Sequence, residues 1–184
     1  MDFYDKWSVI FINRLMKDFN LDLLGAVAIV GNAGHESAGF KKLQEVKPLV
    51  PGSRGGWGIM QWTGPRRREA EAYWERNNLD PSDMDANYKF LFVELSGPEG
   101  GVLPRVKSAK TLEEKTKIFS EMFLRPGIPH MDSRVIWSKR ALDAWGKQVQ
   151  KSTQKPIEPL SKSVGTSLLS SLWTILLMLL RGKE

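Results

Sequence analysis

The stretch Gly31-Asn-Ala-Gly-His-Glu-Ser-Ala-Gly-Phe40 decides the fold, because in it a single acid stands among small residues at the end of an apolar run. The residues before it, 21–33 (LDLLGAVAIVGNA), are apolar nearly all round. That pattern is typical of a buried central helix. We expect this helix to be capped by Asn20 and to stop near Gly34. Glu36 would then lie at or just beyond its C-terminal end.

The segments around this helix predict a mainly helical body with one small β element. Residues 3–19 repeat apolar positions at helical spacing. Residues 40–62 contain prolines, glycines and then alternating residues, which predicts a small β-hairpin or irregular lobe beside the acid. The later helices are predicted from start signals: Pro65, Pro81 with an Asp80 cap, a Thr111–Glu114 capping box, and Asp132 as the cap of a helix that ends near Trp145.

Composition excludes several kinds of chemistry. The chain has 184 residues and no cysteine, so disulfides, thiolate metal sites and cysteine nucleophiles are excluded. Its two histidines, His35 and His130, are too few for a zinc site built from protein ligands, and we predict no metal and no cofactor. The formal net charge of +6 favours binding to polyanions, which include nucleic acid, anionic lipid and the bacterial cell wall.

The position of Glu36 predicts a raised pKa. A carboxylate at a helix C-terminus meets the negative end of the helix dipole, and burial adds a desolvation cost. A glutamic acid that stays protonated near neutral pH can act as a general acid. The alternative is a structural glutamate that caps the helix or forms a salt bridge.

Two hydrolase motifs can be tested at this place in the sequence. A zinc peptidase motif that began at His35 would need a second histidine at the position of Gly39. Ser37 lacks the glycine-flanked turn of a serine nucleophile. Cleavage of a glycosidic bond, which uses a carboxylic acid as proton donor, is the chemistry left for Glu36.

The ordered pair of motifs GHESAGF (34–40) and GGWGIMQWTGPRR (55–67) resembles the signature of the phage tail lysozyme family, peptidoglycan-cleaving enzymes of virions and phage endolysins. The glutamate-serine pair followed by GIMQ also resembles the transglycosylases of the lysozyme superfamily. The resemblance covers roughly residues 20–145. It implies a mainly α, lysozyme-like α+β fold without a metal.

The resemblance implies that Glu36 is the catalytic acid. It places Glu45 near the position of a second carboxylate, although related lysozymes have aspartate there and a threonine where this chain has Pro51. Glu45 is therefore either a base or charge stabiliser, or a surface charge beside Lys47. Gln61 would position a water or an N-acetyl group, or be an ordinary polar residue of a strand.

Several neighbours are predicted to bind substrate. Trp57 and Trp62 can stack on sugar rings, with one of the two in the core instead. Thr63 is a substrate contact or the cap of the next helix. At the start of that helix, Arg66 and Arg67 are predicted to bind wall anions or carboxylates. The residues on either side of the acid, His35 and Ser37, are also predicted to bind substrate.

The last part of the chain differs in composition, and the resemblance does not cover it. We predict a catalytic domain at 1–147, a flexible basic linker at 148–162 and a transmembrane helix at 163–180. The last segment has no charge and would be about 27 Å long as a helix, against roughly 30 Å for a bilayer core. Its stripe of serines and Thr174 favours packing between helices in lipid, hence self-association. The alternative is a tail that folds back on the body.

The sequence thus predicts a phage endolysin, an N-acetylmuramidase that binds peptidoglycan, associates with the inner membrane and does not bind nucleic acid. Because we recognise no signal peptide, we expect it in the host cytoplasm and at the inner membrane. One alternative is a lytic transglycosylase that leaves anhydro-muramic ends. Another is a non-catalytic wall-binding or membrane-disrupting protein, and a third is a lysozyme mounted on the virion.

Overall fold

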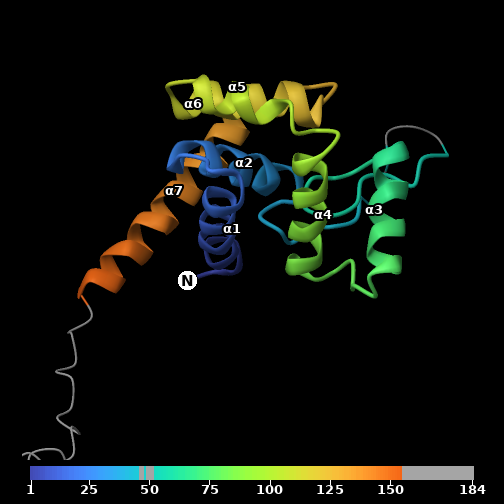
Figure 1. The fold of residues 1–184 in the computed structure, drawn as a ribbon, viewed down its shortest axis with the longest axis horizontal. Helices are drawn as coiled ribbons and strands as arrows, with labels where there is room; N and C mark the ends of the chain where they lie inside the picture. The colour runs from blue at the N-terminus through green and yellow to red at the C-terminus, as the bar shows by residue number, and fades with distance from the viewer. Residues whose placement is uncertain (46–47, 49–51, 155–184) are drawn as a thin grey trace, which may run out of the picture. The chain divides into compact units, whose positions relative to one another are not determined.

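The computed structural model describes residues 1–45, 48 and 52–154, and in this part of the chain it is mainly helical, as predicted (Figure 1). Residues Met1–Lys151 form one compact unit, and of the second unit the structure describes only the last turn of the final helix. The elements are α1 (Phe3–Phe19), α2 (Leu23–Glu36), α3 (Gly64–Arg76), α4 (Met84–Ser96), α5 (Val102–Ser108), α6 (Leu112–Phe119), the π-helical turn η1 (Ser120–Leu124) and α7 (Met131–Gln154).

The buried central helix is α2, and it ends at Glu36 itself. Its cap is Asp22, not Asn20 as predicted: the Asp22 carboxylate accepts the Gly25 N–H at 2.7 Å, whereas Asn20 ends α1 in the left-handed conformation. At Gly31 there is no room for a side chain, because an added Cβ would lie 2.5 Å from the Ser138 Cα of α7. The missing side chain lets α7 pack directly against α2.

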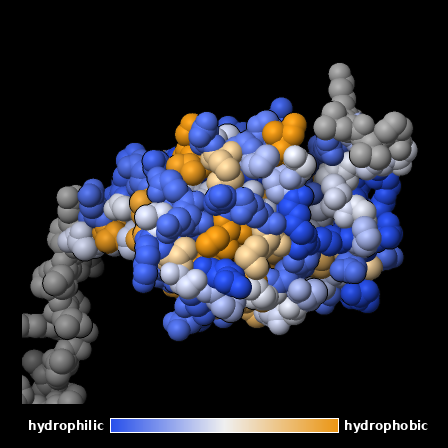
Figure 2. Space-filling view, turned by 90° about the horizontal axis from the view of Figure 1, so that it is seen from above, coloured by the Kyte–Doolittle hydropathy of each residue, from blue (hydrophilic) through white to orange (hydrophobic). Residues whose placement is uncertain are grey.

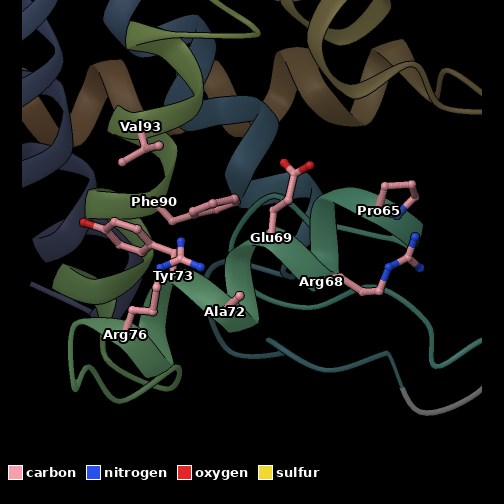
Figure 3. A pocket seen from close by; sticks show the side chains of 8 residues that line it. All are labelled: Pro65, Arg68, Glu69, Ala72, Tyr73, Arg76, Phe90 and Val93. Carbon is pink, nitrogen blue, oxygen red and sulfur yellow. The ribbon is translucent and has the colours of Figure 1, made fainter.

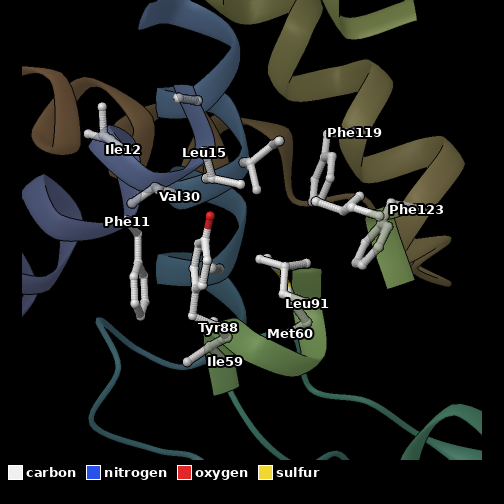
Figure 4. Packing of buried hydrophobic residues seen from close by; sticks show 14 of the residues in the cluster. Phe11, Ile12, Leu15, Val30, Ile59, Met60, Tyr88, Leu91, Phe119 and Phe123 are labelled. Carbon is white, nitrogen blue, oxygen red and sulfur yellow. The ribbon is translucent and has the colours of Figure 1, made fainter. Parts of the chain in front are cut away.

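The hydrophobic core joins every part of the body that bears on the site. Figure 4 shows Phe11 and Leu15 of α1 close to Tyr88 and Leu91 of α4. Ile59, from the segment between α2 and α3, is fully buried in the same core. This burial anchors an irregular segment to the helices.

The segment between α2 and α3 does not form the predicted hairpin in its described part. Two isolated bridges, Gln44 with Trp57 and Trp57 with Trp62, take the place of strands. Gly58 and Gln61 both have positive φ, at 79° and 48°, which interrupts extended backbone. We call the described residues 41–45 and 52–62 the lobe.

Other predicted boundaries shift by a turn or less, with one exception. The Thr111–Glu114 capping box is present, whereas α4 begins at Met84 with Asp83 as its cap rather than at Pro81. The Asp83 carboxylate accepts the Asp85 N–H, so the helix starts one turn later than predicted. The exception is α7, which has Asp132 inside its first turn and continues past Trp145 to Gln154. It therefore includes the first residues of the segment predicted as linker.

The apolar segment 163–180 lies outside the described residues. In the described part of the chain, no helix is both long enough and apolar enough to span a bilayer. The face seen in Figure 2 is mainly hydrophilic, with small separate hydrophobic patches. Isolated exposed hydrophobic residues of this kind are ordinary on a protein surface.

Candidate active site

Glu36 forms a buried ion pair with Arg134; a salt bridge was the alternative considered for this acid, but the sequence did not name its partner. Its carboxylate lies 2.7 Å from an NH2 nitrogen of Arg134, whose side chain is only 2% exposed. The same guanidinium donates to the Asn32 side-chain oxygen at 3.1 Å and to the Pro129 carbonyl at 2.7 Å. Arg134 thus joins the end of α2, the first turn of α7 and the loop before it. Each of the three guanidinium nitrogens thus has an acceptor, and together these contacts fix the position of the group.

A signal for Arg134 was present in the sequence. In the helical pattern from 131 onward, Arg134 shares one face with Ser138 and Ala141, all three of them buried. A cation on the buried face of a helix requires a partner, because arginine is almost never fully buried unpaired. Glu36 is the acid that meets it.

Burial raises the pKa of Glu36, as predicted. Desolvation is the largest cause, and the negative charge of Glu45 raises the pKa further. Arg134 lowers it through its charge and its hydrogen bond, and His130 lowers it slightly. Desolvation prevails, so the proton is held more tightly than on a free glutamate.

His35 is held beside this pair but in its neutral form. Its Nδ1 lies 2.8 Å from the Ser133 hydroxyl, and its ring centroid is 5.8 Å from that of His130. Burial lowers the pKa of His35 to about 4, and the charges of Arg134 and His130 act in the same direction. His35 therefore carries no charge at neutral pH. Ser37 is fully buried, and its hydroxyl caps the end of α2 by donating to the Ala33 carbonyl at 2.7 Å.

Glu45 is held in the lobe by main-chain hydrogen bonds. One of its carboxylate oxygens accepts the Gly56 N–H at 2.9 Å, and its own N–H donates to the Gly56 carbonyl at 2.9 Å. Gln61 closes the same lobe, because its amide nitrogen donates to the carbonyls of Gly58 and Leu43 at 2.9 and 3.1 Å. The amide oxygen of Gln61 is the atom left to accept a hydrogen bond from a substrate or a water.

Arg67 organises the lobe instead of projecting toward the solvent. It is 5% exposed and donates to the carbonyls of Arg54 and Gly55 and to the Gln44 side-chain oxygen. Its guanidinium also lies over the Trp57 ring, 4.9 Å from the centroid. These contacts hold the Gly55–Gly56 turn, which in turn holds the Glu45 carboxylate. The Arg67 guanidinium thus has internal acceptors, and its predicted contact with wall anions stays a prediction.

Arg66 and Trp62 also make hydrogen bonds to an internal group, the buried carboxylate of Glu94. Trp62 is 1% exposed and donates its indole N–H to the buried Glu94 carboxylate at 2.6 Å. Arg66 makes two hydrogen bonds to the same carboxylate, at 2.7 and 2.9 Å. Of the two tryptophans predicted to stack on sugar, Trp62 is therefore the core residue. The internal carboxylate takes the place of the predicted ligand of Arg66.

Trp57 and Thr63 are the more accessible members of the predicted binding set. Trp57 is half-buried, and its indole N–H has no hydrogen-bond partner in the described part of the chain. Thr63 is exposed at the N-cap position of α3, but its side chain makes no capping bond. The described residues contain no group of three or more acids and histidines that could hold a metal ion.

The site therefore has two sides. The helical side contains Glu36, Arg134 and His35, and the lobe side contains Glu45 with Gln61. A buried, protonatable carboxyl next to a second carboxylate can deliver a proton to an oxygen and stabilise the positive charge that develops next to it.

Comparison with known proteins gives one match. The profile of the phage tail lysozyme family matches residues 6–145, which include both sides of the site. No curated protein and no solved structure matches the chain. The family match covers more than half of the chain, from α1 to α7. This chain therefore belongs to the phage tail lysozyme family.

Proposed function

We propose that this chain is a phage endolysin that hydrolyses the glycan strands of bacterial peptidoglycan as an N-acetylmuramidase. Its family is one of peptidoglycan-lytic phage enzymes. The observation that carries the role of Glu36 as the general acid is the Glu36–Arg134 pair. Burial keeps the Glu36 carboxyl protonated to a higher pH than usual, while Arg134 holds it in one position.

The proposed reaction starts with proton transfer from Glu36 to the glycosidic oxygen. The bond from that oxygen to the anomeric carbon breaks, and the sugar ring gains positive charge. Glu36 is now a carboxylate, and the guanidinium at 2.7 Å stabilises it. Glu45 stabilises the positive ring or removes a proton from the attacking water. Water adds its hydroxyl to the anomeric carbon. Where Glu45 only stabilises charge, the Glu36 carboxylate takes the proton of this water; where Glu45 takes that proton, it later releases it to solvent, and Glu36 is protonated again from solvent.

A second candidate is a lytic transglycosylase, in which a hydroxyl of the sugar itself replaces the water. One observation favours it: one Glu45 oxygen is engaged by Gly56, and the Gln61 amide nitrogen by main-chain carbonyls. A reaction that needs no second base could proceed while Glu45 and Gln61 keep these hydrogen bonds. Both candidates keep Glu36 as the acid.

The products of digestion distinguish the candidates. Purified peptidoglycan is incubated with the wild-type chain, Glu36→Gln and Glu45→Gln, and the fragments are identified by mass spectrometry. We expect reducing muramic-acid ends, and a rate about 10³-fold lower in Glu36→Gln, because a general acid contributes 10²–10⁴-fold. Anhydro ends with an unaffected Glu45→Gln would identify a transglycosylase. Equal cleavage by Glu36→Gln would reject both mechanisms.

We further propose that residues 163–180 attach the enzyme to the inner membrane of the host. The support is the sequence, in which no charge occurs between Lys162 and Arg181. Residues 147–184 fused to an inert carrier should then sediment with bilayer vesicles. A fall in membrane potential in cells that express the fusion would mean that the segment also disrupts the inner membrane and so helps the enzyme to reach the cell wall. A fusion that stays in the supernatant would reject the attachment.

A further inference from the structure

A second concave surface lies between α3 and α4, outside the site built around Glu36. The two helices lie side by side (Figure 1), and the pocket between them has a volume of about 420 Å³. Figure 3 shows Arg76, Tyr73 and Phe90 toward one end and Arg68 at the other, with Ala72 and Glu69 between them. We call it the α3–α4 pocket. Its lining residues are Pro65, Arg68, Glu69, Ala72, Tyr73, Arg76, Phe90 and Val93.

The cations of this pocket are available to a ligand. The chain has three consecutive arginines, of which Arg66 and Arg67 are bound to internal acceptors. Arg68 is exposed and forms no ion pair in the described part of the chain, and the same is true of Arg76. Eight residues of helix separate the two, which is roughly 12 Å along the axis. The pocket thus presents two spaced guanidinium groups that can each bind a carboxylate.

The rest of the lining suits a ligand that is only partly charged. Phe90 is 3% exposed and forms the floor, and the partly buried Tyr73 ring lies 5.7 Å from it. Val93, 40% exposed, adds apolar surface. The Tyr73 hydroxyl and the exposed Glu69 carboxylate can accept hydrogen bonds from hydroxyl or amino groups. Sugar rings bind to such aromatic surfaces, whereas a polyphosphate would be repelled by Glu69.

One residue of the pocket, Arg68, also lies next to the lobe. Arg68 also lines a small polar cavity of about 200 Å³, together with Arg54, Gly55 and Arg67. Gly55 belongs to the turn that holds the Glu45 carboxylate. Arg68 thus lies both in the α3–α4 pocket and beside the turn that holds Glu45.

We propose that the α3–α4 pocket is an accessory binding site for the substrate polymer, a glycan strand that carries acidic peptide stems. A sugar ring packs on Tyr73, and stem carboxylates bind Arg68 and Arg76. The proposal rests on the proposed function for the identity of the polymer. It predicts that the pocket contributes to binding of the insoluble wall and leaves the chemistry at Glu36 unchanged.

The test measures binding apart from cleavage. The full chain with Glu36→Gln, which lacks the acid, is sedimented with purified peptidoglycan sacculi. It is compared with the same chain carrying Arg68→Gln and Arg76→Gln, and with a control carrying Arg105→Gln and Lys107→Gln, two exposed cations of α5. We expect about tenfold weaker binding for the pocket variant, which is about 1.4 kcal/mol of binding free energy, and no change for the control.

The other outcomes overturn the proposal. Equal binding by all three proteins would leave the pocket without a role, and equal loss in the control would show that net charge alone attracts the wall. Loss of binding to a short DNA duplex, with sacculus binding intact, would assign the pocket to nucleic acid. With Glu36 intact, the pocket variant should cleave a soluble tetrasaccharide fragment at the wild-type rate. If no protein cleaves it, the proposed function fails, and the binding result still stands.

Discussion

The two carboxyl groups of the site are held by different means on its two sides. On the helical side, Glu36 is fixed by the side chain of Arg134, which is buried between α2 and α7. On the lobe side, Glu45 is fixed by the main chain of Gly56, and the lobe itself is held by the guanidinium of Arg67. One acid depends on a direct ion pair, and the other depends on an arginine that never touches it.

This difference in support affects the pKa of Glu36 and the accessibility of Glu45. Desolvation and a buried cation act on Glu36 in opposite directions, and their balance leaves its pKa raised. Glu45 is partly exposed and lies against glycines, so it can approach a bulky substrate closely. The helical side is thus built to control a proton. The lobe side is built to bring a charge to the substrate.

The largest difference between the two sides is expected when Arg134 is replaced. Replacing Arg134 with Met removes the cation that is paired with Glu36, and should lower the rate about 10²-fold, because a misplaced catalytic group costs that much. It should also lower the free energy of unfolding by about 3 kcal/mol, since a broken buried pair is costly. Arg134 lowers the pKa of Glu36, so its loss should move the alkaline limb of the pH–rate profile to higher pH.

The matched control for Arg134 is Lys139→Met on the same helix. Lys139 pairs with Glu113 on the surface, and its side chain is 63% exposed. Exposed pairs contribute little, so its stability and pH profile should match the wild type. The two measurements are a thermal melt and initial rates between pH 5 and 9. An unmoved alkaline limb in Arg134→Met would mean that a group other than Glu36 controls it.

The helical side was the more predictable of the two. An apolar run that ends in an acid predicted the buried helix, the place of Glu36 at its end and the direction of its pKa shift. Its partner could not be paired with it from the sequence. Arg134 lies about a hundred residues later, and the approach of α7 to α2 depends on Gly31, whose role becomes visible only when the two helices are packed.

The lobe was less predictable for a physical reason. Alternating residues predicted strands, but the segment is held by side chains that bind main-chain carbonyls, as Arg67 and Gln61 do. Every residue has a carbonyl, so no pattern of side chains marks the acceptors. Arg66 and Arg67 were predicted to bind wall anions, and the structure gives them internal acceptors instead.

A smaller effect is expected on the lobe side. Arg67→Gln should lower the rate about tenfold, because the Gly55–Gly56 turn loses its clamp and Glu45 loses its fixed position. Arg67→Lys should rescue little, because an ammonium group cannot reproduce the fork of donors. Because the charge of Glu45 raises the pKa of Glu36, a displaced Glu45 should move the alkaline limb of the pH–rate profile slightly to lower pH, in the direction opposite to that expected for Arg134→Met.

The control for Arg67 is Arg54→Gln. Arg54 and Arg67 share Glu71 as partner, but the Arg54 side chain is 60% exposed. The loss of this side chain should leave the rate within about twofold, as expected for an exposed pair. If Arg54→Gln and Arg67→Gln lose the same activity, the effect comes from Glu71 and not from the clamp on the lobe.

The smallest effect is expected at His35, next to the acid. The pKa of His35 is lowered to about 4 in the folded chain, so the ring is neutral where the enzyme would act and cannot supply the titrating acid. His35→Asn keeps a polar partner for Ser133 and should change the rate less than about threefold, because it removes no group that titrates near neutral pH. The shape of the pH–rate profile between pH 5 and 7 should stay the same.

The same variant should change the pH dependence of stability, although it leaves the pH dependence of the rate unchanged. From about pH 6.5 down to about 4, the unfolded chain binds a proton at His35 that the folded chain does not, so the wild type loses stability as the pH falls through this window. Glu36 acts in the other direction, because its raised pKa makes the folded chain bind the extra proton. His35→Asn removes only the first effect, and its melting temperature should fall less than that of the wild type between pH 6.5 and 4. Equal falls in the two proteins would mean that the pKa of His35 is the same in the folded and the unfolded chain. The ring beside Glu36 would then not be held in its neutral form.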